Sequence, residues 1–174
     1  DAGAAAEGEN ALTPNTTIVE GYVRLGLNAL DRGCPLEALN LLEKARSDRE
    51  VVHAMLGEIQ DDGEGGNIEI YAMEEHPRLS LGLLALGRAY AAMAMYSDAA
   101  STITEAGSSL VKIFGEKSAA VGEAILALAE ISSAKGHTRD ALLQYSHAYH
   151  LIATQLNPSH PRLLSILIAA AENM

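Results

Sequence analysis

The sequence is poor in the residues that stabilise disulfide-rich or β-sheet domains. It contains one cysteine, Cys34, one phenylalanine and no tryptophan among 174 residues, and aromatic residues make up only 4%. A single cysteine excludes an internal disulfide and gives no sign of an oxidising compartment, so we expect an intracellular, cytoplasmic protein. The low aromatic content disfavours a β-sandwich, whereas the abundant alanine and leucine favour helices.

Basic residues and long apolar runs are also scarce. The chain has 12 basic and 23 acidic residues, a formal net charge of −11. Phosphate backbones and anionic lipids repel such a chain, so we expect no nucleic-acid partner, whereas a basic protein partner is compatible with the charge. Glycine, glutamate or lysine interrupts each apolar stretch before the ~18 residues that a membrane span needs, so we predict no membrane insertion.

The sequence contains an internal repeat. His76-Pro77 recurs as His160-Pro161, and the offset between the two dipeptides is twice 42. When the chain is shifted by this 42-residue period, small and apolar positions coincide without a gap. Leu83, Leu86, Gly87, Ala99, Ile103 and Ala106 fall on Ile125, Leu128, Ala129, Ala141, Tyr145 and Ala148. A regular period of this length predicts stacked units of supersecondary structure.

Each unit has the pattern of two helices joined by a short turn. Leu83, Leu86, Gly87 and Tyr90 follow at i, i+3, i+4 and i+7, one face of an α-helix. Small residues then recur where two helices of a hairpin would cross closely: Gly87 and Ala99 in one unit, Ala129 and Ala141 in the next. The spacing therefore predicts an all-α fold of antiparallel helix hairpins.

The segment LLALGRAYAAMAMYSDAASTITEA, residues 83–106, resembles the tetratricopeptide repeat. The 42-residue period and the His-Pro before the first helix are most similar to the long-helix repeats of kinesin light chains. The resemblance covers roughly residues 76–174. It implies a helical-repeat solenoid with a right-handed superhelix, and a protein–protein interaction module that acts as a scaffold or adaptor.

An earlier unit precedes these repeats. The spacing from Gly26 to Gly87 is longer than the 42-residue period, so a segment is inserted between the first unit and the second. We expect a disordered segment 1–14 and a single repeat domain 15–174. Its parts are unit 1 at about 16–60, an insertion loop 61–75, unit 2 at about 76–115, unit 3 at about 118–157 and a terminal helix 161–174. The terminal helix lacks a partner, so either the native protein continues or this helix caps the array and packs against something else.

Residues that bear chemistry do not form a recognisable site. His147 and His150 lie at i, i+3, but no third ligand falls on their face. Cys34 has no histidine within several residues, and the acidic segment at Asp61 lacks the oxygen ligands of a calcium loop. We predict no metal, no cofactor and no catalytic residue, and hence a protein that is not an enzyme.

The resemblance implies that the first helices of the units line a concave groove. Its predicted residues are Arg24, Leu27, Leu84, Arg88, Glu123, Leu126 and Glu130. Leu84 and Leu126 stand where kinesin light chains carry asparagines that bind a peptide backbone. An apolar groove would instead suit a peptide or amphipathic helix of a partner. In the other interpretation, Leu84 and Leu126 pack against neighbouring units.

Two further functions remain open at this stage. Similar repeats follow the catalytic part of some lysine methyltransferases, so the chain could be the C-terminal or regulatory region of a larger enzyme. It could also be a structural subunit buried in a large assembly, with the insertion and the terminal helix as docking surfaces.

Overall fold

The computed structural model describes residues 14–59 and 77–174, and this part of the chain folds into seven α-helices. They are α1 (Pro14–Asp31), α2 (Pro35–Ile59), α4 (Pro77–Ala92), α5 (Tyr96–Phe114), α6 (Ala119–Ala134), α7 (Thr138–Ala153) and α8 (Pro161–Ala171). The predicted disordered segment 1–14 lies almost wholly outside the described residues, and the predicted loop 61–75 lies wholly outside them. The all-α prediction is confirmed for the described residues.

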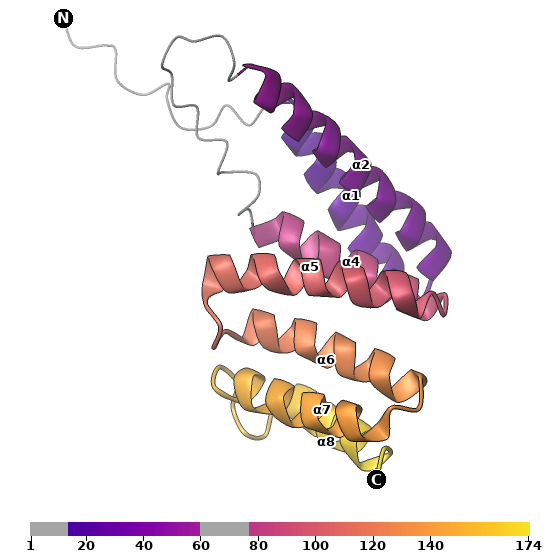
Figure 1. The fold of residues 1–174 in the computed structure, drawn as a ribbon, viewed down its shortest axis with the longest axis vertical. Coiled ribbons are helices and arrows are strands. Elements are labelled where there is room, and N and C mark those ends of the chain that lie inside the picture. The colour runs from indigo at the N-terminus through magenta and orange to yellow at the C-terminus, as the bar shows by residue number, and fades with distance from the viewer. Residues whose placement is uncertain (1–13, 60–76) are drawn as a thin grey trace, which may run out of the picture.

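The helices form hairpins that stack along the long axis of the molecule (Figure 1). α1 pairs with α2, α4 with α5 and α6 with α7, and each hairpin packs on the next in chain order. α8 packs on α7 at the opposite end of the stack from α1 and α2. We refer to α1, α4, α6 and α8 as first helices and to α2, α5 and α7 as second helices.

The three hairpin turns have the same construction. Gly33, Ala94 and Gly136 occupy equivalent positions and adopt φ values of 72°, 59° and 75°. The residue after each of them donates its backbone N–H to a carbonyl five residues earlier: Cys34 to Ala29, Met95 to Tyr90 and His137 to Ser132, at 2.9, 2.9 and 2.8 Å. These bonds satisfy carbonyl groups that the helix end leaves without a partner.

Close helix crossings are made by small residues, as the sequence predicted. Ala99 and Ala141 have no exposed surface. A Cβ atom added to Gly87 would overlap the Ile103 side chain, and one added to Gly122 would lie 2.8 Å from Cγ1 of Ile152. A larger side chain at these positions would separate the helices, because protein interiors are close-packed.

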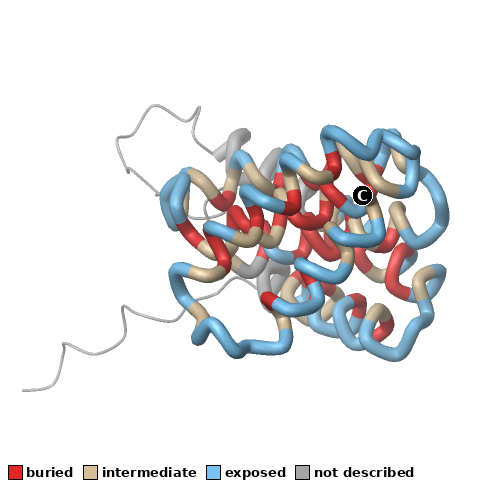
Figure 2. The backbone as a smooth tube through the Cα atoms, turned by 90° about the horizontal axis from the view of Figure 1, so that it is seen from below, coloured by how far each residue is buried: buried red, intermediate tan, exposed pale blue. Residues whose placement is uncertain are grey.

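The core runs as a continuous series of clusters between successive helices, visible as buried segments inside the stack in Figure 2. Polar contacts also join the first two hairpins. The Tyr90 hydroxyl donates a hydrogen bond to Glu43 at 2.7 Å, and Arg46 pairs with Glu105 at 3.2 Å. Burial, followed by this bond to Glu43, raises the pKa of Tyr90 to about 12.

Candidate interaction surface

Charged side chains of three first helices meet on one surface. The Arg88 guanidinium of α4 donates to the Glu123 carboxylate of α6 at 2.7 Å. Arg162 of α8 donates two hydrogen bonds to the same carboxylate, at 3.0 and 2.5 Å. Glu123 therefore links three first helices that come from three successive units. The three side chains are partly buried, with 35%, 27% and 37% of Arg88, Glu123 and Arg162 exposed.

The electrostatics of Glu123 favour its charged form. Burial alone would raise the pKa of this carboxyl, but the hydrogen bonds from Arg162 and Arg88 outweigh burial and lower the pKa. The hydrogen bond to Glu123 likewise raises the pKa of Arg162. Because both arginines direct donors at one carboxylate, the triad is a fixed part of the surface.

Glu130 lies two helical turns after Glu123 and has a different environment. Within residues 14–59 and 77–174, no hydrogen bond or ion pair reaches its carboxylate. Glu130 is exposed, yet the surrounding protein shields its carboxylate from part of the solvent. This shielding raises the pKa of Glu130, and the nearby charges of Arg88 and Arg162 oppose that rise. Glu130 thus offers a hydrogen-bond acceptor that no described donor uses.

Exposed leucines lie at equivalent positions of the neighbouring units. Leu27 aligns with Arg88 by the same offset that relates Gly26 to Gly87, and Leu81 aligns with Glu123 by the 42-residue period. These leucines are 38% and 40% exposed. We call the surface that carries Leu27, Leu81, Arg88, Glu123, Glu130 and Arg162 the first-helix face.

Two of the predicted groove residues do not lie on the first-helix face. Leu84 and Leu126 are only 4% and 2% exposed. Leu84 packs in the cluster that includes Ala99 and Ile103, and Leu126 packs in the cluster that includes Tyr145. Both face the second helix of their own hairpin, so they belong to the core, whereas the other interpretation had them packed against neighbouring units.

Arg24 stands apart from the other charged residues. It is exposed and aligns with Ala85 and Ala127. Those alanines are buried in clusters with α2 and with α5, the second helices of the preceding units. Arg24 therefore lies on the end of the stack, and no described contact joins it to the triad.

The groove prediction did not include Arg162. Under the shift by one repeat period it falls on Ala120 in unit 3, whereas a shift by two periods places it on Arg78 in unit 2. The signal was the recurrence of His-Pro-Arg-Leu, at residues 76–79 and again at 160–163. His160 caps α8 by accepting a hydrogen bond from the backbone N–H of Arg162. The His-Pro motif therefore fixes where α8 begins, and with it the position of Arg162 in the first turn.

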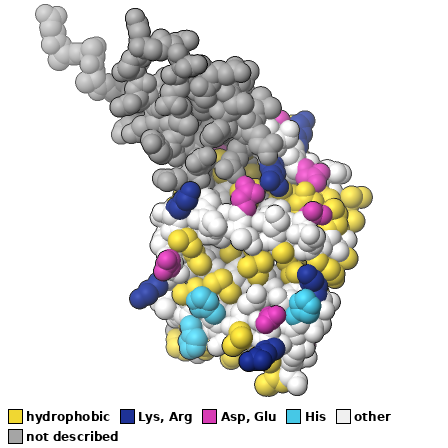
Figure 3. Space-filling model, viewed as in Figure 1, with side chains coloured by type: hydrophobic (Ala, Val, Ile, Leu, Met, Phe, Trp, Pro, Cys, Tyr) yellow, Lys and Arg dark blue, Asp and Glu magenta, His cyan; other side chains and the backbone are white. Residues whose placement is uncertain are grey.

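The remaining candidates for chemistry do not assemble in the described residues. No group of three His, Cys, Asp or Glu side chains there could hold a metal ion. His147 and His150 are exposed on α7, and Figure 3 shows histidine side chains on the surface over the lower part of the molecule. Cys34 is exposed in the first hairpin turn. None of the described helices combines the length and apolar character needed to cross a membrane.

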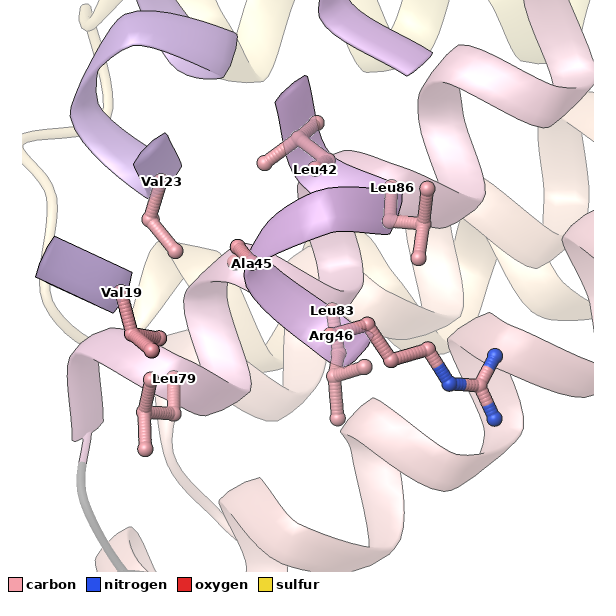
Figure 4. Close-up of a pocket in the computed structure, with 9 residues that line it drawn as sticks. Val19, Val23, Leu42, Ala45, Arg46, Leu79, Leu83 and Leu86 are labelled. Carbon is pink, nitrogen blue, oxygen red and sulfur yellow. The ribbon is translucent and has the colours of Figure 1, made fainter. Parts of the chain in front are cut away.

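A small recess lies between α1, α2 and α4 (Figure 4). Apolar side chains line most of it, including Val19, Val23, Leu42 and Leu79, with Arg46 at one side. Its volume of about 20 Å³ is close to the space of a single water molecule. The recess is therefore a packing gap between the first two units.

Comparison with known proteins shows similarity at the level of structure. No protein-family model matches the sequence, and no curated protein matches it either. A crystal structure of TPR-like repeats from a putative kinesin light chain of Podosopora anserina is similar, with a TM-score of 0.63 and 20% identity, covering 93% of this chain and 67% of that one. A second crystal structure, of a substituted variant of those repeats, has a TM-score of 0.64 and 19% identity, covering 92% and 67%. The chain therefore has the tetratricopeptide-like helical-repeat fold.

Proposed function

We propose that this chain is a protein-binding scaffold that holds a peptide or helix of a partner on its first-helix face. The observation that carries the proposal is the pairing on that face. Glu123 neutralises part of the charge of Arg88 and Arg162, while Glu130 beside them keeps an unused acceptor. The paired charges of Arg88, Glu123 and Arg162 hold the surface in one arrangement, and the Glu130 carboxylate can accept a hydrogen bond from a ligand. Such a surface is suited to positioning a ligand.

The exposed leucines indicate what else the partner supplies. Leu27 of α1 and Leu81 of α4 are exposed on the first-helix face, the surface that also carries the charged triad. Apolar side chains beside a polar rim are typical of sites that bind an amphipathic helix or a short peptide. We therefore expect the partner to bring apolar residues to Leu27 and Leu81 and a lysine or arginine to Glu130.

The overall charge supports a basic partner. A net charge of −11 repels polyanions and speeds the encounter with cationic proteins at low salt. The fold of the two similar structures, repeats of a putative kinesin light chain, is one in which stacked units present an extended continuous surface. Both points favour a protein ligand over a nucleic acid.

The test is a selection from a displayed peptide library, followed by affinity measurements with purified peptides. We expect selected peptides to combine apolar residues with at least one lysine or arginine. Glu130→Gln removes the charge of the free acceptor and should weaken binding of the basic peptides by roughly tenfold, since ~1.4 kcal/mol corresponds to a factor of 10. Leu81→Ser should weaken binding through lost apolar contact.

Leu143→Ser is the matched control, because Leu143 is 65% exposed but lies on the second helix α7. It should leave affinity unchanged, and far-ultraviolet circular dichroism should show that all variants keep their helices. Peptides whose binding depends on Leu143 and not on Leu81 or Glu130 would place the binding surface on the second helices and contradict the proposal.

A further inference from the structure

One repeat position lies on the first-helix face of four successive first helices. Leu27 of α1, Arg88 of α4 and Glu130 of α6 are equivalent, and a further shift of 42 residues reaches Glu172 after α8. Glu172 caps α8 with backbone angles of φ −66° and ψ −16°, which are still helical, so the register holds there. We call Leu27, Arg88, Glu130 and Glu172 the cross-stack row.

The side chains of the cross-stack row are accessible to a ligand. Leu27 is 38% exposed, 35% of the Arg88 side chain is exposed, and both glutamates are exposed. On the side of the hairpin turns the row borders Ala92 and Ala134, which are exposed and too short to cover it. A partner that crosses the first helices can therefore contact all four members of the row.

The electrostatics show that members of the row on neighbouring helices lie close together. Partial shielding from solvent raises the pKa of Glu130, and the charge of Arg88 on the adjacent first helix opposes that rise. The pKa of Tyr145 on α7 is raised first by burial and then by the charges of both Glu130 and Glu172. The charged part of the row therefore forms one continuous line from α4 to α8.

The row changes in character from one end of the stack to the other. It is apolar at α1, positive at α4, and negative at α6 and α8. In the part of the chain that the structure describes, no hydrogen bond or ion pair reaches the carboxylate of Glu130 or Glu172. The negative end of the α8 dipole adds to the attraction that Glu172 has for a cation. Arg88 repels a cation at its own position, and Leu27 would remove water from one without replacing its hydrogen bonds.

We infer that the partner crosses the stack in one order, with an apolar side chain on Leu27 and two lysine or arginine side chains on Glu130 and Glu172. This inference rests on the proposed function and specifies the partner further. Packed helices lie roughly 10 Å apart. Three residues of a polyproline II segment span about 9 Å and return the side chain to the same side. An extended partner segment can thus place one side chain on each first helix at every third residue.

The test uses two synthetic ten-residue peptides of identical composition, with serine and proline at the other positions. The ordered peptide has leucine at its first position and lysine at its seventh and tenth. The permuted peptide has lysine at its first and tenth positions and leucine at its seventh, an order that fits the row in neither direction. Nuclear magnetic resonance titration measures weak affinities and reports on folding. We expect the ordered peptide to bind at least tenfold more tightly, although both peptides carry the same charge.

Single variants locate the basic side chains. Glu172→Gln and Glu130→Gln should each weaken binding of the ordered peptide several-fold. Glu116→Gln is the matched control, because Glu116 is exposed in the loop between α5 and α6, away from the row, and its loss changes the net charge equally. It should leave affinity unchanged.

The outcomes separate this inference from the proposed function. Equal affinity for the two peptides, or no effect of Glu172→Gln, would overturn the inferred order. If Glu130→Gln still weakened binding in that case, the first-helix face would remain the binding surface. If Glu130→Gln had no more effect than Glu116→Gln, binding would not involve this face, and both proposals would fall.

Discussion

The second and third hairpins show how two units of the same repeat can share a fold and differ in surface. In the core their equivalent positions agree, as with Leu84 and Leu126, both buried against their own second helix. On the first-helix face they disagree. Leu81 and Arg88 of α4 correspond to Glu123 and Glu130 of α6, so an apolar residue and a cation are replaced by two acids.

The difference teaches which positions the repeat constrains. Core positions must fill the same space in every unit, whereas surface positions of adjacent units need only suit one another. Arg88 of unit 2 donates to Glu123 of unit 3. These residues stand at different positions of the repeat, because Arg88 aligns with Glu130 and Glu123 aligns with Leu81. The pair therefore forms where one unit carries the arginine and the next carries the acid.

The largest expected effect comes from removing the shared core leucines. Leu84→Ala and Leu126→Ala should each lower the free energy of unfolding by about 2–5 kcal/mol, because each deletion leaves a cavity between packed helices. Urea unfolding measures both variants. The equivalence of the hairpins predicts similar losses at the two positions.

Leu143→Ala is the control for these core deletions, since this leucine is 65% exposed. It should change stability by less than ~0.5 kcal/mol. If Leu84→Ala or Leu126→Ala behaved like the control, that leucine would be accessible, and its original assignment to a groove would return.

Leu84 and Leu126 show where reasoning from sequence was sufficient and where it was not. The 42-residue period predicted the helices, their turns and the small residues at the crossings, because burial repeats at fixed intervals. A first helix inside the stack, however, is buried on two sides, by its own second helix and by that of the preceding unit. Apolar residues such as Leu84 are therefore needed for packing, and periodicity alone could not separate packing from binding.

The contacts between the charged residues could not be predicted from the sequence, for a different reason. Arg88, Glu123 and Glu130 were assigned to a common surface by their register, and the structure brings them near one another. Arg162 was not assigned, because its partner Glu123 is distant in the sequence and only the rotation between successive units brings the two together. The arginine recurs after His-Pro, as Arg78 and Arg162, but the repeat does not show which acid it contacts.

An intermediate effect on stability is expected at the hairpin turns of units 2 and 3, which differ in one residue. Ala94 adopts φ 59° at the position where unit 3 has Gly136 with φ 75°. A left-handed conformation costs an alanine roughly 1–2 kcal/mol and a glycine almost nothing. Ala94→Gly should therefore stabilise the chain by about 1 kcal/mol, and Gly136→Ala should destabilise it by a similar amount.

Thermal and urea unfolding of the two turn variants and of the double variant measure this difference. The two sites lie in separate turns, so the double variant should return to nearly the wild-type stability. Loss of stability in Ala94→Gly would mean that the Ala94 side chain makes a contact worth more than the backbone strain it imposes.

The smallest effect separates the two acids of α6. The pKa of Glu123 is lowered in the folded chain, so its charge stabilises the fold above the ordinary carboxyl value of 4.5, and this contribution is lost as the pH falls through the lowered pKa. Glu123→Gln should lower the free energy of unfolding by about 0.5–1 kcal/mol at neutral pH, with the difference from wild type vanishing in acid.

The pKa of Glu130 is raised, so its charged form opposes folding and Glu130→Gln should be neutral or slightly stabilising at neutral pH. Urea unfolding at neutral and acidic pH compares the two variants directly. A loss of stability in Glu130→Gln equal to that in Glu123→Gln would show that Glu130 also has a partner within the chain, and the acceptor assigned to an external ligand would no longer be free.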